Sequence, residues 1–393
     1  MVKKNNYEKN SGAPMREERS LRQELFALHE TAAAYFHEAF HAQDATGNFM
    51  REYWVNQRKF DMALADEFQI GAAAPDATAT DGGLVARLRE AQFSEEALRQ
   101  CGLFFIRDDE PLTMHTAKPR FRGRLMIPIR DHQGRVSAFA ARQTALTPSD
   151  APAHEAKYIN SPETPIFTKG AILFNLDRAR AAVAPDAPFV LVEGHFDALR
   201  CWSVGIKTAV AFQGATISKL QLALLRRYHT QVECLFDTDA AGQSAAMRLL
   251  PLALWAGLEP RFLTLTPATE AKTAPDQFFL KRGKAAHEEL RAHARSAMAF
   301  ACGNLLPCAA SAKPNEKIRA MMSMFDIVQR AESEPTRHLF IEEAANHLCL
   351  PLALVRAAFK KRARAAGLRE TDPAKRKQQL AERLRQIRTG QEN

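Results

Sequence analysis

Phe189-Val-Leu-Val-Glu-Gly-His-Phe-Asp197 is the stretch that decides the fold. Its four leading apolar residues predict a short buried strand, Glu193 stands where that strand ends, and residues 195–204 then read as a helix. The same alternation continues downstream, with strands expected at 208–211, 232–236 and 261–265 and helices expected at 217–228 and 240–255. Strands that alternate with helices are typical of a parallel sheet with flanking helices, so we predict an α/β domain.

Acidic residues stand at the ends of three of these strands. Glu193 ends the first, Asp237 and Asp239 follow the third in Phe236-Asp-Thr-Asp-Ala-Ala-Gly242, and Asp276 follows the fourth. The ends of neighbouring parallel strands lie about 4.8 Å apart at one edge of a sheet, so these carboxylates can converge. Convergent carboxylates repel one another unless a cation neutralises them, and oxygen ligands favour Mg²⁺ or Mn²⁺. A D-x-D pair alone often serves only as a helix N-cap; its combination with Glu193 favours a metal site suited to phosphoryl transfer.

A basic segment lies upstream, in Arg120-Phe-Arg-Gly-Arg-Leu-Met-Ile-Pro-Ile-Arg130. Basic and apolar residues alternate in it, which predicts a strand with one basic face that includes Arg120, Arg122 and Arg124. Asp131-His-Gln-Gly134 reads as a turn, and residues 135–140 as the returning strand of a hairpin. Such a face suits phosphate binding, and the alternative is a surface hairpin joined by salt bridges.

The rest of the chain is mainly helical. We expect helices within residues 24–60 and 84–99, a loop at 71–83, and a three-helix unit at 318–330, 335–349 and 351–362. The domains we predict are a disordered tail at 1–18, an α+β N-terminal basic subdomain at 19–185, an α/β domain at 186–290, a helical subdomain at 291–365 and a basic tail at 366–393.

Composition limits the classes of protein to consider. The net charge of +9, from 54 Lys+Arg against 45 Asp+Glu, favours a polyanionic partner. The six cysteines include no C-x-x-C pair, so we expect no zinc, and no apolar run is long enough to predict a membrane span. We therefore expect a cytoplasmic protein. His37 and His41 lie one helical turn apart, but no third ligand follows at a fixed spacing, so we interpret both, with His29, as surface or core histidines.

The pairing of Glu193 with Asp237-Thr-Asp239 resembles the Toprim domain, which bacterial primases, type IA and type II topoisomerases and some nucleases and recombination proteins share. Lys157-Tyr-Ile-Asn-Ser-Pro-Glu-Thr-Pro-Ile-Phe-Thr-Lys-Gly170 resembles a stretch peculiar to bacterial-type DNA primases, as do the basic segment and Phe139-Ala-Ala-Arg142. The resemblance runs from about Leu28 to Arg362 and covers the RNA-polymerase core of that family, with a central Toprim sheet.

The resemblance implies roles for individual residues. Glu193 would be the catalytic carboxylate at the primer 3′-hydroxyl, and Asp197 would support it. Asp237, Asp239 and Asp276 would hold metal ions together with Glu193. The residues that would face template or nucleotide phosphates are Arg122, Arg142, Lys157, Asn160 and Lys169.

The resemblance also implies an activity, the synthesis of short RNA primers on single-stranded DNA from NTPs during replication. A monomer at the bacterial replication fork is expected, with the replicative helicase or a separate zinc-domain chain as further partners. The resemblance extends to neither the zinc-binding domain nor the helicase-binding domain of the family, so we expect both to be missing here, and Ala274 stands where the family has an Asp.

Two alternatives remain open. One is a weakened or split primase that only binds single-stranded DNA. The other is a different Toprim enzyme, such as a nuclease or a topoisomerase, although a topoisomerase also needs a nucleophilic Tyr in a separate domain. A fused helicase is not expected, because the sequence has no phosphate-binding G-x-x-x-x-G-K-[ST] loop.

Overall fold

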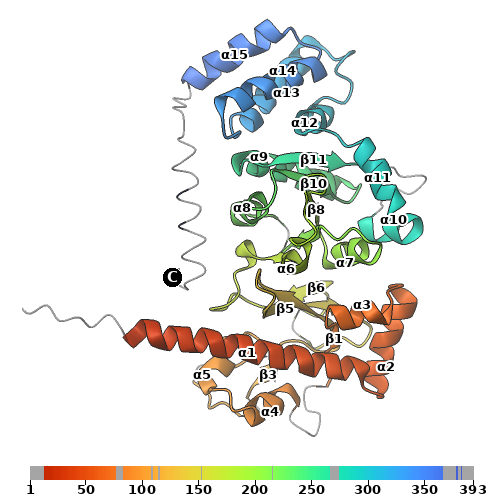
Figure 1. Cartoon of the computed structure of the whole chain (residues 1–393), viewed down its shortest axis with the longest axis vertical. Helices are drawn as coiled ribbons and strands as arrows, with labels where there is room; N and C mark the ends of the chain where they lie inside the picture. The colour runs from red at the N-terminus through yellow and green to blue at the C-terminus, as the bar shows by residue number, and fades with distance from the viewer. Residues whose placement is uncertain are drawn as a thin grey trace, which may run out of the picture. The chain divides into compact units, whose positions relative to one another are not determined.

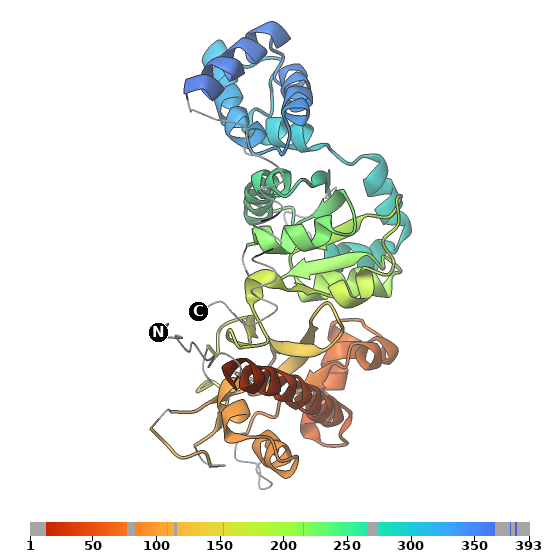
Figure 2. The same cartoon turned by 60° about the vertical axis from the view of Figure 1, so that its left-hand side comes forward.

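The computed structural model describes residues 13–76, 83–107, 109–113, 116–151, 153–214, 216–265 and 274–365, together with Gln378 and Glu382 (Figures 1 and 2). The chain separates into two compact units, residues 1–168 and residues 169–391. Residues 169–185 therefore belong with the second unit, whereas the sequence grouped them with the N-terminal subdomain. The physical reason is β7 (Leu173–Phe174), which pairs with β9 (Ala209–Phe212) of the second unit.

Helices open the first unit. They are α1 (Ala13–His41), α2 (Ala45–Glu52), a π-helical turn (Tyr53–Gln57), α3 (Met62–Glu67), α4 (Gly83–Glu90) and α5 (Glu95–Gln100). Asp44 and Asp61 cap α2 and α3 by accepting hydrogen bonds from backbone N–H groups of the first turn. Helix α1 begins inside the tail predicted to be disordered, and residues 1–12 of that tail lie outside the described residues.

A four-stranded antiparallel sheet completes the first unit, in the order β1-β4-β5-β6. Its strands are β1 (Gly71–Ala72), β4 (Arg124–Arg130), β5 (Val136–Gln143) and β6 (Tyr158–Asn160), and a separate ribbon joins β2 (Phe104–Phe105) to β3 (Lys118–Pro119). Helix α1 packs on one face, where the rings of Phe36 and Phe139 meet with centroids 5.4 Å apart (Figure 1). The predicted hairpin is confirmed, but its first strand begins at Arg124 rather than at Arg120.

Strand β1 corrects the prediction of a continuous loop at 71–83. Gly71 and Ala72 pair with Met126 and Leu125 of β4. A Cβ atom at Gly71 would lie only 2.5 Å from Cβ of Phe36 on α1. The glycine therefore lets this edge strand approach the helix closely.

The second unit contains a five-stranded sheet in the order β11-β10-β8-β9-β7. Strands β8 (Phe189–Val192), β9, β10 (Gln231–Leu235) and β11 (Glu259–Leu263) are parallel, and β7 runs antiparallel at one edge. The helices of this part are α6 (Leu176–Ala179), α7 (His195–Ser203), α8 (Lys219–Arg226), α9 (Ala240–Trp255), α10 (Pro275–Arg282) and α11 (Ala285–Ala292). Helices α8 and α9 cover one face of the sheet, and α7 and α10 cover the other (Figure 1). The four parallel strands and their helices confirm the predicted α/β fold.

After α11, the described residues of the second unit form α12 (Ala297–Leu305), α13 (Pro314–Val328), α14 (Glu334–His347) and α15 (Leu352–Ala365). The three predicted helices are confirmed, and one apolar core joins them to the sheet through residues such as Leu250 of α9 and Phe325 of α13. The predicted tail at 366–393, with the apolar positions Leu380, Leu384 and Ile387, lies outside the described residues except for Gln378 and Glu382. Among the helices that the structure describes, none has both the length and the apolar character to span a bilayer.

Candidate active site

Glu193 and Asp237 meet at the edge of the sheet where β8 and β10 end. The two strands are parallel neighbours, with Leu191 paired to Cys234, so the residues just beyond them lie side by side. The backbone N–H of Asp237 points at Oε1 of Glu193, with 3.4 Å between the two atoms. The sheet thus brings together two acidic residues that are 44 positions apart in the sequence.

Asp239 follows Asp237 and begins α9. Its Oδ1 accepts a hydrogen bond of 2.9 Å from the backbone N–H of Gly242, which makes Asp239 the N-cap of the helix. A Cβ atom at Gly242 would lie 2.3 Å from the carbonyl oxygen of Asp237. The glycine therefore permits a tight turn that keeps Asp237 and Asp239 together at the strand end.

Asp197 lies behind this pair, in the first turn of α7. Its Oδ2 accepts from the N–H of Gly194 at 3.1 Å, and its Oδ1 accepts from the N–H of Asp276 at 2.9 Å. Burial of the side chain, together with the negative charges of Asp237 and Asp276, raises the pKa of Asp197 from 3.8 to about 7. The carboxylate thus joins the start of α7 to the start of α10, and its raised pKa reflects burial first and the neighbouring negative charges second.

Asp276 forms a buried ion pair with Arg200 of α7. The Nε atom of Arg200 lies 2.9 Å from Oδ1 of Asp276, and the two side chains are 4% and 11% exposed. The sequence marked Asp276 as a metal ligand but did not single out Arg200. Arg200 is the one charged residue in the otherwise apolar segment Ala198-Leu-Arg-Cys-Trp202. This pattern could have identified it, because a buried arginine requires an acidic or carbonyl partner. Ala274 is the N-cap of α10, where an alanine provides no side-chain oxygen.

The donor set suits a hard divalent cation. Glu193, Asp237 and Asp239 offer carboxylate oxygens, which Mg²⁺ and Mn²⁺ prefer over nitrogen or sulfur ligands. Nearby His195 adds no positive charge at neutral pH, since burial lowers its pKa from 6.5 to about 4. The repulsion among the carboxylates is the electrostatic cost that a bound cation would remove.

Arg142, Tyr158 and Asn160 lie on one face of the sheet in the first unit. Arg142 pairs with Tyr158 and Ala140 pairs with Asn160, and alternate residues of a strand share a face. The guanidinium of Arg142 lies 4.8 Å from the ring centroid of Tyr158. Because Phe139 points from the opposite face toward α1, these polar residues lie on the side away from that helix. Lys157 precedes them and is exposed.

Arg124 does not face solvent as predicted. Its side chain is buried, with the residue 1% exposed, and its guanidinium donates to the carbonyl oxygens of Ala156 at 2.9 Å and of Ala153 at 2.8 Å. Among the described residues, the carbonyls of His154 and Ala141 also accept from it. Arg124 therefore holds the loop after β5 in place. The alternation identified its strand correctly, but could not show that this position is covered.

Arg120 and Arg122 precede β4 and have separate surroundings. Arg122 bonds to the carbonyl of Pro75 and forms an ion pair of 3.1 Å with Asp150. Arg120 lies 4.0 Å from the ring centroid of Phe105 and lines a cavity of about 830 Å³ together with Lys118. The three arginines therefore do not form the single basic face that the sequence predicted.

Lys169 and Asn160 complete the residues predicted to bind nucleic acid or nucleotides. Lys169 lies in the second unit, in a short 3-10 turn (Lys169–Ala171), and its carbonyl accepts from Gln221 of α8 at 3.0 Å. Asn160 has a buried Oδ1 atom for which the described part of the chain provides no hydrogen-bond partner. An unpartnered buried acceptor is costly, so a ligand or water is expected at Asn160.

The sequence of this chain is similar to that of bacterial DNA primases over most of its length. The model of the DNA primase catalytic core, N-terminal domain, matches residues 35–180, and the Toprim-like model matches residues 190–276. The DNA primase of Synechococcus elongatus is 30% identical over 335 residues, which are 84% of this chain and 45% of that protein. The Escherichia coli K12 DNA primase is 30% identical over 345 residues, 87% of this chain and 55% of that protein. The chain thus spans about half the length of these relatives.

Solved structures of primase catalytic domains are similar to this structure over most of the chain. A DnaG primase catalytic domain bound to single-stranded DNA has a TM-score of 0.68 at 29% identity, and the match covers 84% of this chain and 98% of that one. A DNA primase domain from Pseudomonas aeruginosa has a TM-score of 0.70 at 26% identity, covering 85% and 98%. The chain belongs to the bacterial DNA primases, and it carries their catalytic core, a DnaG-type N-terminal domain followed by a Toprim-like domain.

Proposed function

We propose that this chain makes short RNA primers on single-stranded DNA by template-directed transfer of nucleotides from NTPs. The observation that carries the proposal is the meeting of Glu193 and Asp237 at the ends of two adjacent parallel strands, with Asp239 two residues further on. Transfer of a nucleotidyl group mainly requires positioning and neutralisation of phosphate charge, which such a cluster can organise. The family relationship to bacterial DNA primases supports the same activity.

The carboxylates have different roles in this proposal. Glu193 accepts the proton of the primer 3′-hydroxyl or orients that hydroxyl for attack. Asp237 and Asp239, with Glu193, hold divalent cations, which the Toprim family uses and for which we propose Mg²⁺ or Mn²⁺. When bound, such a cation supplies charge neutralisation at the reacting phosphate. Asp197 and Asp276 are positioning residues, since one accepts two backbone N–H groups and the other pairs with Arg200.

Basic and polar residues would contact the phosphates of the template and of the nucleotides. We propose Arg142, Lys157 and Asn160 in the first unit and Lys169 in the second. Arg120 is retained as a candidate because it lines an open cavity beside an aromatic ring, and Arg122 is retained because its partner Asp150 is exposed. Arg124 is not among these residues, since its guanidinium bonds to backbone carbonyls inside the protein.

Primer synthesis on a single-stranded template with NTPs tests the activity, with Mg²⁺ and Mn²⁺ supplied separately. Glu193→Gln is expected to lower the rate by about a hundredfold or more, as the loss of a positioned acid–base group does. The matched control is Glu259→Gln, because Glu259 is an exposed glutamate at the opposite, amino-terminal end of β11 in the same sheet. Equal products from wild type and Glu193→Gln would refute the assigned site.

A second candidate function is single-stranded DNA binding without synthesis. The observation that favours it is Ala274, which leaves the start of α10 without the carboxylate of the family pattern. This alternative predicts salt-sensitive binding of single-stranded DNA by a protein that incorporates no nucleotide in either metal. Metal-dependent incorporation, however short the product, excludes it.

The cellular setting belongs to the same proposal. We propose that the protein acts as a monomer in the bacterial cytoplasm at the replication fork, with the replicative helicase or a separate zinc-domain chain as partner. Stimulation of primer synthesis by the helicase or by a zinc-domain protein, added to the purified chain, is the measurement that tests these partners.

A further inference from the structure

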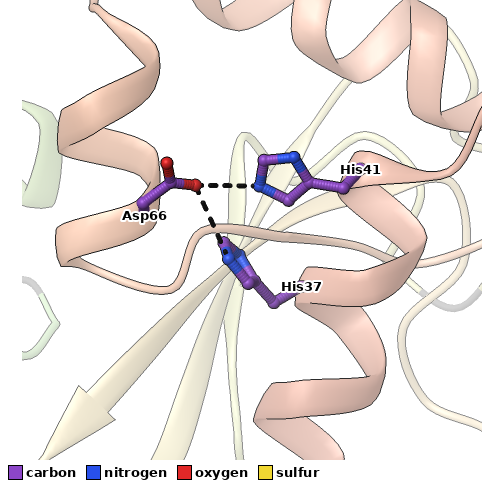
Figure 3. Close-up of side chains that lie close together, drawn as sticks. All are labelled: His37, His41 and Asp66. Atoms are coloured by element: carbon purple, nitrogen blue, oxygen red, sulfur yellow. Dashed lines mark hydrogen bonds and ion pairs between the residues drawn. The ribbon is translucent and has the colours of Figure 1, made fainter.

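Two histidines and one aspartate of the first unit converge at the end of α1 (Figure 3). His37 and His41 lie one turn apart on α1, and Asp66 comes from α3. Oδ1 of Asp66 lies 2.9 Å from Nε2 of His41 and 3.7 Å from Nε2 of His37, and the three candidate ligand atoms all lie within 4.8 Å of one another. Both imidazole rings thus direct the same nitrogen toward one carboxylate oxygen.

The ring of His37 is oriented by a contact on its other side. Its Nδ1 atom lies 2.8 Å from the carbonyl oxygen of Ile70. A carbonyl oxygen only accepts hydrogen bonds, so Nδ1 carries the proton and the lone pair of a neutral ring is on Nε2. Histidines that bind metals are usually held in this way, with one nitrogen donating to a carbonyl and the other turned toward the ion.

The distances are close to those of a metal site. Two ligands about 2.0–2.2 Å from a tetrahedral ion are about 3.3–3.6 Å apart. The separations of 2.9 and 3.7 Å from Asp66 lie on either side of that range. The two histidine nitrogens lie within 4.8 Å of each other, so side-chain rotations would bring all three ligand atoms to such separations. The three side chains are 23%, 40% and 57% exposed, so an ion can enter and water can complete its coordination.

We propose that His37, His41 and Asp66 bind a divalent transition-metal ion, with Zn²⁺ as the best match. Two imidazoles and one carboxylate favour Zn²⁺, Co²⁺ or Ni²⁺ over Mg²⁺, which prefers oxygen ligands alone. A simple ion pair between His41 and Asp66 explains the 2.9 Å contact, but it does not require the ring of His37 to point Nε2 at the same oxygen.

The proposal departs from the interpretation of the two histidines as surface or core residues, and the titration below distinguishes the two. The third ligand, Asp66, is 25 residues beyond His41 and belongs to another helix, so no fixed spacing could reveal it. Bound metal would connect the end of α1 to α3 and stabilise the first unit. The proposal uses none of the residues of the acidic cluster, so it does not depend on the proposed function.

The test uses the whole chain, first freed of metal with a chelator and then kept in excess Mg²⁺. Sites made only of carboxylates are then filled by Mg²⁺, while the histidine site remains open to Zn²⁺. Calorimetric titration with Zn²⁺ compares wild type with His41→Gln and Asp66→Asn. The control is His338→Gln, because His338 lies 3.9 Å from exposed Glu334 and so also pairs with a carboxylate, outside the proposed site.

We expect one saturable Zn²⁺ site in wild type and in His338→Gln, and a loss of affinity of at least about tenfold in both site variants. Zn²⁺ should also raise the thermal unfolding temperature of the first two proteins alone. Because His41 and Asp66 are exposed, their substitution should leave the fold intact, and far-ultraviolet circular dichroism verifies this. Equal affinity in all four proteins, or no saturable binding by wild type, overturns the proposal.

A second measurement needs no variant. Co²⁺ bound through two imidazoles and a carboxylate in four-coordinate geometry gives strong visible absorption, which Zn²⁺ should abolish by displacement. If Co²⁺ shows only the weak bands of the hydrated ion in the presence of the wild-type chain, the site does not bind metal as proposed.

Discussion

Arg200→Met should destabilise the second unit by about 3–5 kcal/mol, which is the cost of breaking a buried ion pair by removing one partner. The magnitude follows from the surroundings of the pair. Arg200 and Asp276 are joined at 2.9 Å with side chains 4% and 11% exposed, so solvent screens the remaining charge poorly. In the variant, the carboxylate of Asp276 would stay buried beside Asp197 without its guanidinium partner. Methionine keeps an apolar stem of similar length, so the loss reports on charge more than on packing.

A double-mutant cycle separates the pair from its surroundings. Asp276→Asn alone should also be costly, but the double variant should lose less than the sum of the single variants by about 2 kcal/mol, because neither charge is then buried alone. Urea unfolding without divalent cations measures these values, and the fluorescence of Trp202 on the same helix reports on the second unit. Arg356→Met is the control, since its ion pair with Glu342 is about half exposed and should contribute less than about 1 kcal/mol.

Two results would refute this reasoning. A loss of less than about 1 kcal/mol in Arg200→Met would place the pair among ordinary surface contacts. Strict additivity in the cycle would show that Arg200 and Asp276 contribute independently, whatever their distance.

Three further predictions concern other parts of the chain. Ala274→Asp and Ala274→Ser should each stabilise α10 by about 1 kcal/mol in Mg²⁺, measured by thermal unfolding, because both supply the missing N-cap oxygen. Burial lowers the pKa of His29 from 6.5 to about 4. As the pH falls from 6.5 to 4, His29 becomes protonated in the unfolded chain but stays neutral in the folded chain. The free energy of unfolding should therefore drop by about 3 kcal/mol over this range, and the drop should be smaller in His29→Leu. Arg124→Met should cost about 1–3 kcal/mol and speed proteolysis near Ala153, since the backbone carbonyls of that loop lose their donor; unchanged cleavage would count against this role.

The parallel strands of the second unit could be predicted because their signal is local. Phe189–Val192 and Ala209–Phe212 are buried throughout, so each appears in the sequence as an apolar run whatever its neighbours are. Strands β1 and β7 have only two residues each. Their pairing depends on partners more than 35 residues away, and neither length nor composition distinguishes them from loop.

The acidic cluster could be predicted for a related reason. Its members follow strand ends, and parallel pairing carries those ends to one edge of a sheet. The partners of charged residues could not be predicted, because they depend on tertiary packing. Arg200 meets Asp276 from 76 residues away, and Glu233 within β10 meets His287 and Arg291 of α11. The same limit explains Arg124, whose alternating pattern marks a strand face but not whether that face is covered.

These contacts indicate what the alanine at position 274 changes in the acidic cluster. Asp276 is neutralised by the protein's own Arg200, and both oxygens of Asp197 accept backbone N–H groups. The carboxylates that we propose as cation ligands, Glu193, Asp237 and Asp239, are all retained in the sequence. Ala274 leaves the N-terminus of α10 without a side-chain cap. In the same turn, the backbone N–H of Asp276 donates to Asp197. Loss of the cap should affect primer synthesis through the position of α10. Ala274→Ser should therefore restore synthesis as well as Ala274→Asp does, because both residues cap a helix.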